Sequence, residues 1–179
     1  MSLNIIILAA GNGKRMHSAL PKVMHKVGGK TMLEHVLISA EKLNPKSINV
    51  VVNSKIEDIK ANFQNYKINW LNQKEQKGTA DAVNTALPNL KEDDEVLILY
   101  ADTPLIDYKL LEKFISYMPD SDAKVLTVEL ENPFGYGRII REQAEKEIIS
   151  RIVEETEAND TQKNIKECNT GIVFSRVGV

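Results

Sequence analysis

The segment Leu3-Asn-Ile-Ile-Ile-Leu-Ala-Ala-Gly-Asn-Gly-Lys-Arg15 is the most informative stretch of this chain. Its first six residues, apolar except for Asn4, are typical of a strand buried on both faces of a parallel sheet. The two glycines that follow permit a tight turn, and N–H groups in such a turn can point toward an anion. Lys14, Arg15 and the nearby Lys22 add positive charge. The segment therefore predicts a strand ending at a polyphosphate-binding loop, with an ordinary glycine turn carrying solvated basic side chains as the alternative.

The glycine spacing distinguishes this loop from two other phosphate-binding loops. A dinucleotide-binding fingerprint requires a third glycine at the position where Met16 stands. A P-loop requires a glycine where Leu8 stands and a serine or threonine where Arg15 stands. The spacing excludes both.

The following sequence alternates between apolar strands and amphipathic helices. The pattern predicts strands at 48–52, 68–71, 96–100 and 125–130, and helices at 33–43, 56–63, 79–87 and 110–115, with Pro88 ending the third helix. This alternation is typical of a three-layer α/β/α fold with a Rossmann-like, mostly parallel sheet. Ligands of such sheets bind beyond the carboxyl ends of the strands, so we expect the glycine loop and Asp102 at the same edge.

The pattern changes in the last third of the chain. Residues 132–138 are rich in turn formers, and the apolar stretches 139–140 and 148–153 predict the strands of a hairpin. Polar residues 154–166 predict a loop or a helix, and 172–174 predict a last short strand. We expect one domain over the whole chain.

Composition limits the class of protein. The 179 residues are 42% apolar and 27% charged, which indicates a soluble globular protein. A net charge of −2 gives no general attraction to nucleic acid or to an anionic membrane, so we expect neither as a partner. Cys168 is the only cysteine, which excludes an internal disulfide and a thiolate zinc cluster. We expect no signal peptide or membrane span and a cytoplasmic location, and we expect the acidic residues 92–95 to form a solvated turn.

Separate blocks along the chain together resemble sugar nucleotidyltransferases. The blocks are Leu8-Ala-Ala-Gly-Asn-Gly-Lys-Arg-Met16, Leu20-Pro-Lys-Val23, Gly29-Lys30 with Glu34-His-Val36, Gln73 with Gly78-Thr79, Tyr100-Ala-Asp102, Pro133-Phe-Gly-Tyr-Gly-Arg138, Ile152-Val-Glu154 and Asn169-Thr-Gly171. They are similar to the uridylyltransferase domains of the bifunctional bacterial N-acetylglucosamine-1-phosphate uridyltransferase/glucosamine-1-phosphate acetyltransferase family. The first block alone would also fit molybdenum-cofactor guanylyltransferases and isoprenoid cytidylyltransferases, whereas the blocks ending at Arg138 and Gly171 favour the sugar enzymes.

The resemblance implies a Mg²⁺-dependent enzyme that forms UDP-N-acetylglucosamine and pyrophosphate from UTP and N-acetylglucosamine 1-phosphate. It implies nucleotide contacts for Leu8, Ala9, Ala10, Gly11, Lys22, Gln73, Gly78 and Thr79. It also implies catalytic positive charge at Arg15 and Lys22, a metal ligand at Asp102, and sugar-phosphate contacts at Tyr100, Gly137, Glu154 and Asn169. Judged from the residues alone, Asp102 could instead cap a helix, Lys22 could be a surface lysine, and Glu154 could be a solvated glutamate.

The sequence departs from the family pattern in three respects. Ala101 stands where the family usually has glycine, and Asp81 stands where it has histidine. The family's uridylyltransferase domain continues beyond the position of Val179 and supplies an asparagine as a second metal ligand. We therefore expect a C-terminally truncated domain, without the β-helix acetyltransferase domain that builds the family trimer. A nucleotide-binding fragment without turnover, and a nucleotidyltransferase for another sugar 1-phosphate, are the alternatives.

Overall fold

The structure is a computed structural model that describes residues 2–11, 13, 16–53, 56–75, 78–118, 121–142, 145 and 147–178. The chain divides into two compact units, Met1–Lys124 with Val173–Val179 as unit 1 and Val125–Ile172 as unit 2. Arg15, for which a catalytic role is predicted, lies outside the described residues, as does Lys14.

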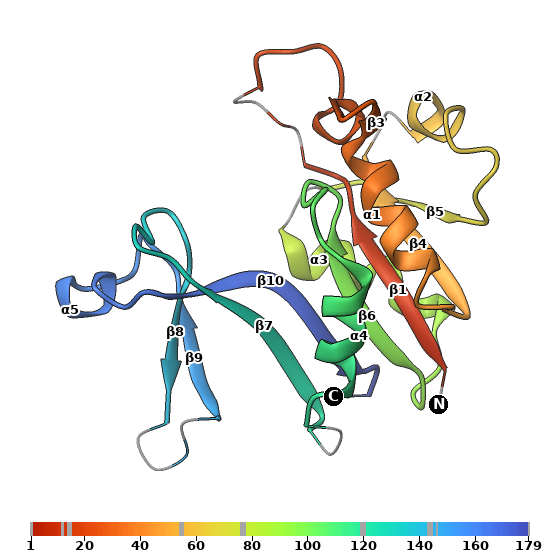
Figure 1. The fold of residues 1–179 in the computed structure, drawn as a ribbon. Helices are drawn as coiled ribbons and strands as arrows, with labels where there is room; N and C mark the ends of the chain where they lie inside the picture. Colours follow the sequence, from red (N-terminus) through yellow and green to blue (C-terminus); the bar gives the residue numbers. More distant parts are fainter. Residues whose placement is uncertain are drawn as a thin grey trace. The chain divides into compact units, whose positions relative to one another are not determined.

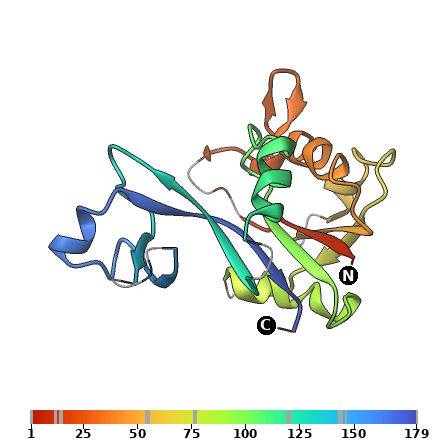
Figure 2. The ribbon, with the colours of Figure 1, turned by 60° about the horizontal axis from the view of Figure 1, so that its bottom comes forward.

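Unit 1 is built on a mostly parallel sheet. Its strands lie in the order β5 (Asn69–Asn72), β4 (Ser47–Val52), β1 (Leu3–Leu8) and β6 (Glu95–Tyr100), each parallel to its neighbour. Residues 173–176 of β10 (Glu167–Arg176) then pair with β6 in the antiparallel direction. Figures 1 and 2 show β1 and β6 running alongside each other. The predicted Rossmann-like sheet is therefore confirmed.

The apolar run of β1 forms the centre of the core. Ile5, Ile6 and Ile7 have no exposed surface, because β4 and β6 flank the strand and helices cover its faces. Complete burial of one such side chain contributes about 1.5–3 kcal/mol to the free energy of unfolding. The strand therefore provides a rigid base for the loop that follows it.

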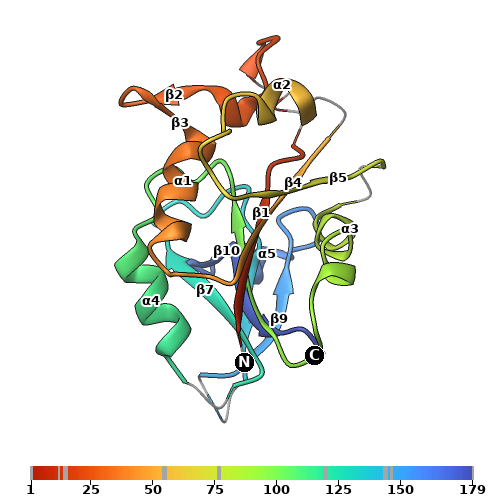
Figure 3. The ribbon, with the colours of Figure 1, turned by 90° about the vertical axis from the view of Figure 1, so that its right-hand side faces the viewer.

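Helices cover both faces of this sheet. Figure 3 shows α1 (Met32–Glu41) and α4 (Tyr108–Ser116) on one side of β1, and α3 (Thr79–Asn84) on the other. The Thr31 side chain caps α1 by accepting a hydrogen bond from the Glu34 N–H at 3.1 Å. Ala82 of α3 packs against Leu8 and Val51 in one buried cluster. The short helix α2 (Ile56–Lys60) lies within the predicted range 56–63.

Two local predictions differ from the structure. The helix predicted to run from 79 to 87 ends at Asn84, and Pro88 lies inside a separate 3-10 turn, η3 (Leu87–Asn89). Proline fits the first turn of a helix because the N–H that it lacks has no partner there. A two-stranded hairpin of β2 (Lys26–Val27) and β3 (Lys30–Thr31) was not predicted. The turn at Gly28 and Gly29 joins its strands.

The acidic run 92–95 is not the fully solvated turn that was predicted. Asp94 is only 5% exposed and forms an ion pair with Lys46 at 3.0 Å. It also accepts a hydrogen bond from the N–H of Lys91. The hydrogen bond from Lys46 lowers the pKa of Asp94 below its ordinary value. The run thus contributes one ion-paired carboxylate to unit 1.

Unit 2 is built from antiparallel strands. The predicted hairpin is confirmed as β8 (Arg138–Arg141) and β9 (Ile149–Val153), and Cys168 of β10 pairs with Arg138 of β8. β7 (Ala123–Glu129) also pairs with β10. The polar stretch after β9 contains α5 (Asp160–Lys163), which begins with a capping box formed by Asn159 and Gln162. No helix among the described residues has the length and apolar character that crossing a membrane requires.

Candidate active site

A pocket of about 350 Å³ opens in unit 1, where β1 and β6 end. This volume lies within the range of about 300–1,000 Å³ that is usual for small-molecule sites. Its lining comprises Leu8, Ala9, Ala10, Gly11, Lys22, Val23, Gln73, Gly78, Thr79, Ala82, Tyr100 and Asp102. All eight residues predicted to contact a nucleotide are among them, as are Tyr100 and Asp102. The expected placement of the glycine loop and Asp102 at one sheet edge is thereby confirmed.

The backbone of the glycine loop approaches Lys22 closely. Gly13 has a φ of +55°, and a Cβ atom built on it would lie 2.8 Å from the Cβ of Lys22. Both the dihedral angle and the lack of space require glycine at this position. Lys22 begins the 3-10 turn η2 (Lys22–Met24), directly after Pro21. Loop and turn together hold the base of the Lys22 side chain beside the pocket.

Lys22 and Asp102 form an ion pair within the pocket. The two side chains are 32% and 33% exposed, so a ligand can reach both. Lys22 is therefore not an isolated surface lysine. The helix-cap alternative for Asp102 is wrong, since Asp107 is the residue that precedes α4. The ammonium and the carboxylate come from positions 80 residues apart in the chain.

Gln73, Gly78, Thr79 and Tyr100 form another part of the pocket lining, and they belong to a small polar network. The side-chain N–H group of Gln73 donates to the carbonyl oxygen of Gly78 at 3.2 Å and to the Asp81 carboxylate at 2.8 Å. The Tyr100 hydroxyl lies 3.4 Å from the hydroxyl oxygen of Thr79. Asp81 thus orients a glutamine that is only 5% exposed.

The other three residues predicted to bind a sugar phosphate meet in unit 2. The N–H of Asn169 donates to the carbonyl oxygen of Gly137 at 2.8 Å. A Cβ atom on Gly137 would lie 3.2 Å from Oε1 of Glu154, so the Glu154 carboxylate extends over the glycine. The fourth residue, Tyr100, belongs to the pocket of unit 1.

The pocket residues fit a magnesium ion that also uses ligand oxygens. Mg²⁺ is commonly bound by one or two carboxylates, with phosphate oxygens and waters completing its shell. Asp102 supplies one accessible carboxylate at the pocket wall. Among the described residues, no group of three or more His, Cys, Asp or Glu side chains is arranged to hold a metal ion by itself.

Sequence reasoning missed three features of this site. Val23 and Ala82 line the pocket, although neither was predicted to do so. Their signals were present, because Val23 follows Lys22 directly and Ala82 lies one turn after Gly78 at the start of α3. The contact between Asp81 and Gln73 carries no such signal, since it depends on how the strand-to-helix loop folds.

Comparison with known proteins adds sequence and fold evidence. A family model described as "MobA-like NTP transferase domain" matches residues 5–162. The chain is 48% identical over 173 residues to the "Bifunctional protein GlmU" of Pseudomonas putida strain GB-1, a match that covers 97% of this chain. The chain spans only 37% of the length of that relative.

Solved structures with similar folds include two nucleotide-dependent transferases. The inositol-1-phosphate CTP transferase from T. maritima superposes with a TM-score of 0.78 at 18% identity, covering 97% of this chain and 70% of that one. A UDP-glucose pyrophosphorylase complexed with UDP-glucose gives a TM-score of 0.76 at 17% identity, covering 98% and 76% of the two chains. At these identities the likeness establishes the fold alone.

Proposed function

This chain belongs to the MobA-like NTP transferase domain family, and on that premise we propose that it is a uridylyltransferase. The proposed reaction joins UTP and N-acetylglucosamine 1-phosphate to give UDP-N-acetylglucosamine and pyrophosphate. One observation carries the proposal: a single pocket is lined by the glycine-loop residues, by the Gln73 network and by the Lys22–Asp102 pair. The 48% identity to a protein named "Bifunctional protein GlmU" supports the choice of substrates.

The chemistry is a single displacement at phosphorus. An oxygen of the sugar phosphate forms a bond to the α-phosphorus of UTP, and the bond from that phosphorus to the bridging oxygen of pyrophosphate breaks. The attacking phosphate is already ionised at neutral pH, so no protein nucleophile or general base is required. The dominant barrier is the approach and alignment of two anions, which positive charge and positioning lower.

The residues of unit 1 divide this work between binding and charge. The backbone of Leu8 to Gly11 would enclose the nucleoside, with Gln73, Gly78 and Thr79 contacting the uracil. Lys22 would bind the triphosphate and stabilise the negative charge that develops on the leaving pyrophosphate, and Arg15 is proposed to assist it. Mg²⁺ held by Asp102 would supply Lewis-acid charge neutralisation at the phosphate oxygens.

The residues of unit 2 are proposed to bind the acceptor. Gly137, Glu154 and Asn169 would hold N-acetylglucosamine 1-phosphate, and an acceptor contact is also proposed for Tyr100. A carboxylate and an amide suit this role, because both accept hydrogen bonds from sugar hydroxyl groups and the amide also donates. A cytoplasmic location, where nucleoside triphosphates are available, is part of the same proposal.

A pyrophosphate-release assay tests the proposal directly. We expect release from UTP only when N-acetylglucosamine 1-phosphate and Mg²⁺ are both present. A panel of nucleoside triphosphates and sugar 1-phosphates identifies the preferred pair, and a clear preference for another pair would replace the proposed specificity. Calorimetric binding of UTP by folded protein without turnover would instead identify a nucleotide-binding protein.

A further inference from the structure

The most completely buried charged side chain of the described residues belongs to unit 2. Arg138 is only 1% exposed. It lies in a row across three strands, with Val153 of β9 on one side and Cys168 of β10 on the other, and both neighbours are buried. Burial of an arginine is costly unless its charge is paired, so the contacts of Arg138 require an explanation.

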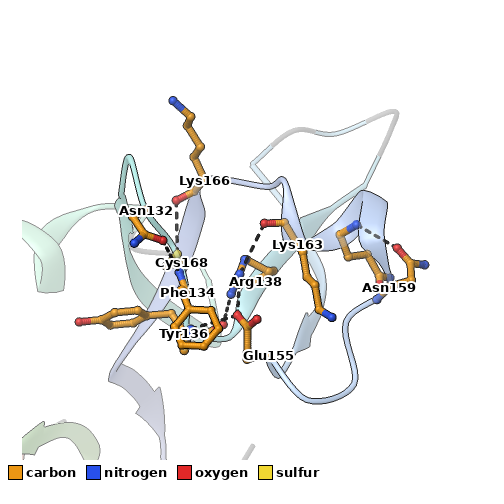
Figure 4. A network of polar contacts seen from close by, with 11 residues as sticks. Asn132, Phe134, Tyr136, Arg138, Glu155, Asn159, Lys163, Lys166 and Cys168 are labelled. Carbon is orange, nitrogen blue, oxygen red and sulfur yellow. Dashed lines mark hydrogen bonds and ion pairs between the residues drawn. The ribbon is translucent and has the colours of Figure 1, made fainter.

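The contacts of Arg138 join three segments of unit 2. One guanidinium nitrogen donates to the Glu155 carboxylate at 2.7 Å, and another donates to the carbonyl oxygen of Tyr136. The first also lies 3.5 Å from the carbonyl oxygen of Lys163 at the end of α5. The same Glu155 oxygen accepts the N–H of Gly135 at 3.0 Å. Figure 4 shows Arg138 at the centre of this network.

The residues proposed to bind the acceptor form the adjacent row of the same sheet. Gly137 directly precedes β8, Glu154 directly follows β9, and Asn169 follows Cys168 within β10. Because these strands are antiparallel, all three steps go in the same direction along the sheet. Glu154 lies over Gly137 whereas its neighbour Glu155 reaches Arg138, so the acceptor row and the Arg138 row are directed to opposite faces, as successive residues of extended chain are.

We propose that the Arg138–Glu155 ion pair is a positioning device that fixes Gly137, Glu154 and Asn169 for the acceptor sugar phosphate, an inference that rests on the proposed function. Glu155 follows Glu154 directly, so anchoring it to Arg138 limits where the Glu154 carboxylate can go. Its bond to the Gly135 N–H anchors the turn that leads into Gly137. Arg138 acts from the opposite face and touches no reacting atom.

The tightness of the acceptor row makes it sensitive to this support. The space where a Gly137 side chain would lie is closed by Ile152 at 3.0 Å and by Glu154 at 3.2 Å. Relaxation of the loop or of Glu155 would therefore move a carboxylate that lies directly over Gly137. The hydrogen bond from Arg138 also lowers the pKa of Glu155, which favours the charged carboxylate that the ion pair requires.

The substitution Glu155→Gln tests the proposal on the intact chain. Glutamine keeps the size of the side chain and an oxygen for the Gly135 N–H, but it removes the charge that pairs with Arg138. We expect the KM and the calorimetric Kd for N-acetylglucosamine 1-phosphate to rise about tenfold through misplacement of binding groups. We expect the Kd for UTP to stay within about twofold of the wild-type value. Partial unfolding would weaken the binding of both ligands, so a change in acceptor affinity alone indicates misplacement of the acceptor row.

Glu167→Gln is the matched control. Glu167 of β10 pairs with Arg141, which lies in β8 as Arg138 does. The Glu167 side chain is 21% exposed, as is that of Glu155. We expect this variant to lose a partly exposed ion pair, with neither affinity changed beyond about twofold.

The outcomes separate this inference from the proposed function. Unchanged acceptor affinity in Glu155→Gln, or equally weakened binding of the acceptor and of UTP, would overturn the positioning role. Turnover by the wild-type protein would still support the proposed function in that case. Wild-type protein that binds UTP but no N-acetylglucosamine 1-phosphate would overturn the proposed acceptor and this inference with it. If Glu155→Gln does not melt cooperatively, the same two affinities measured on Glu155→Asp decide.

Discussion

The pocket of unit 1 and the acceptor row of unit 2 use charge in different ways. The pocket lies at loops where parallel strands end, and its charged pair, Lys22 and Asp102, is about one-third exposed on each side. The acceptor row lies where antiparallel strands begin and end, and its supporting pair contains an Arg138 side chain that is only 2% exposed. Accessible charge can be exchanged for a ligand, whereas buried charge holds geometry. The two regions are therefore expected to fail differently when mutated.

The largest effect is expected for Asp102→Ala. Loss of the carboxylate proposed to hold Mg²⁺ should reduce pyrophosphate release by about 10²–10³-fold, as expected for removal of a major charge-stabilising group. Stability should change by less than about 1 kcal/mol, because the Lys22 pair is partly exposed. Asp107→Ala, an exposed aspartate outside the pocket lining, should leave turnover unchanged. Full turnover in Asp102→Ala would remove this carboxylate from the mechanism.

Lys22→Ala comes next and tests exchange of charge in the pocket. We expect UTP affinity to fall by about 10–100-fold, since one charge-assisted contact to phosphate is lost. Affinity for N-acetylglucosamine 1-phosphate should stay unchanged, and circular dichroism should show an intact fold. Lys26→Ala supplies an exposed lysine as control. UTP affinity equal to that of the wild type would refute the assigned contact.

A smaller effect, on the acceptor and not on UTP, is expected for Gly137→Ala. The added methyl group would meet Ile152 at 3.0 Å and Glu154 at 3.2 Å, so one of them has to move. Crowding of this kind costs about 1–3 kcal/mol, and we expect acceptor affinity to fall about fivefold with UTP affinity retained. Calorimetry with each substrate separately measures the split. Weakening of UTP binding alone would reverse the assignment of the two regions.

The smallest effect is a pH dependence of stability. The hydrogen bond from Arg138, followed by that from the Gly135 N–H, holds the pKa of Glu155 below its ordinary value of 4.5. The resulting stabilisation is present above 4.5 and is lost as the pH falls through the lower folded-state value. Urea unfolding should therefore find Glu155→Gln less stable than the wild type at pH near 7, with the gap closing in acid. A gap that widens in acid would contradict this.

The elements that sequence predicted well are those with a strong local pattern. The apolar runs of β1, β4 and β6 correspond to their strands, and the helical spacing after Thr31 corresponds to α1. Each of these signals depends on burial of residues that are near one another in the chain. The premature end of α3 shows the limit, since its helical pattern continues past Asn84 while the chain turns.

Residues of the candidate site were predictable as types, but their partners were not. The resemblance selects Lys22 and Asp102 separately, whereas their contact across 80 residues follows only from the pairing of β1 with β6. The adjacent glutamates Glu154 and Glu155 are indistinguishable by composition. The register of β8 and β9 separates them, because it directs one over Gly137 and the other to Arg138.

The contact between Lys22 and Asp102 also has a thermodynamic consequence. Each of the two groups neutralises the other, so an anion or a cation that arrives alone has to displace a partner. Under the proposed function, an anion that draws Lys22 away leaves the carboxylate to attract a cation, and the reverse also holds. Linkage requires the two effects to be equal, so nucleotide and magnesium should enhance each other's binding through this one exchangeable contact.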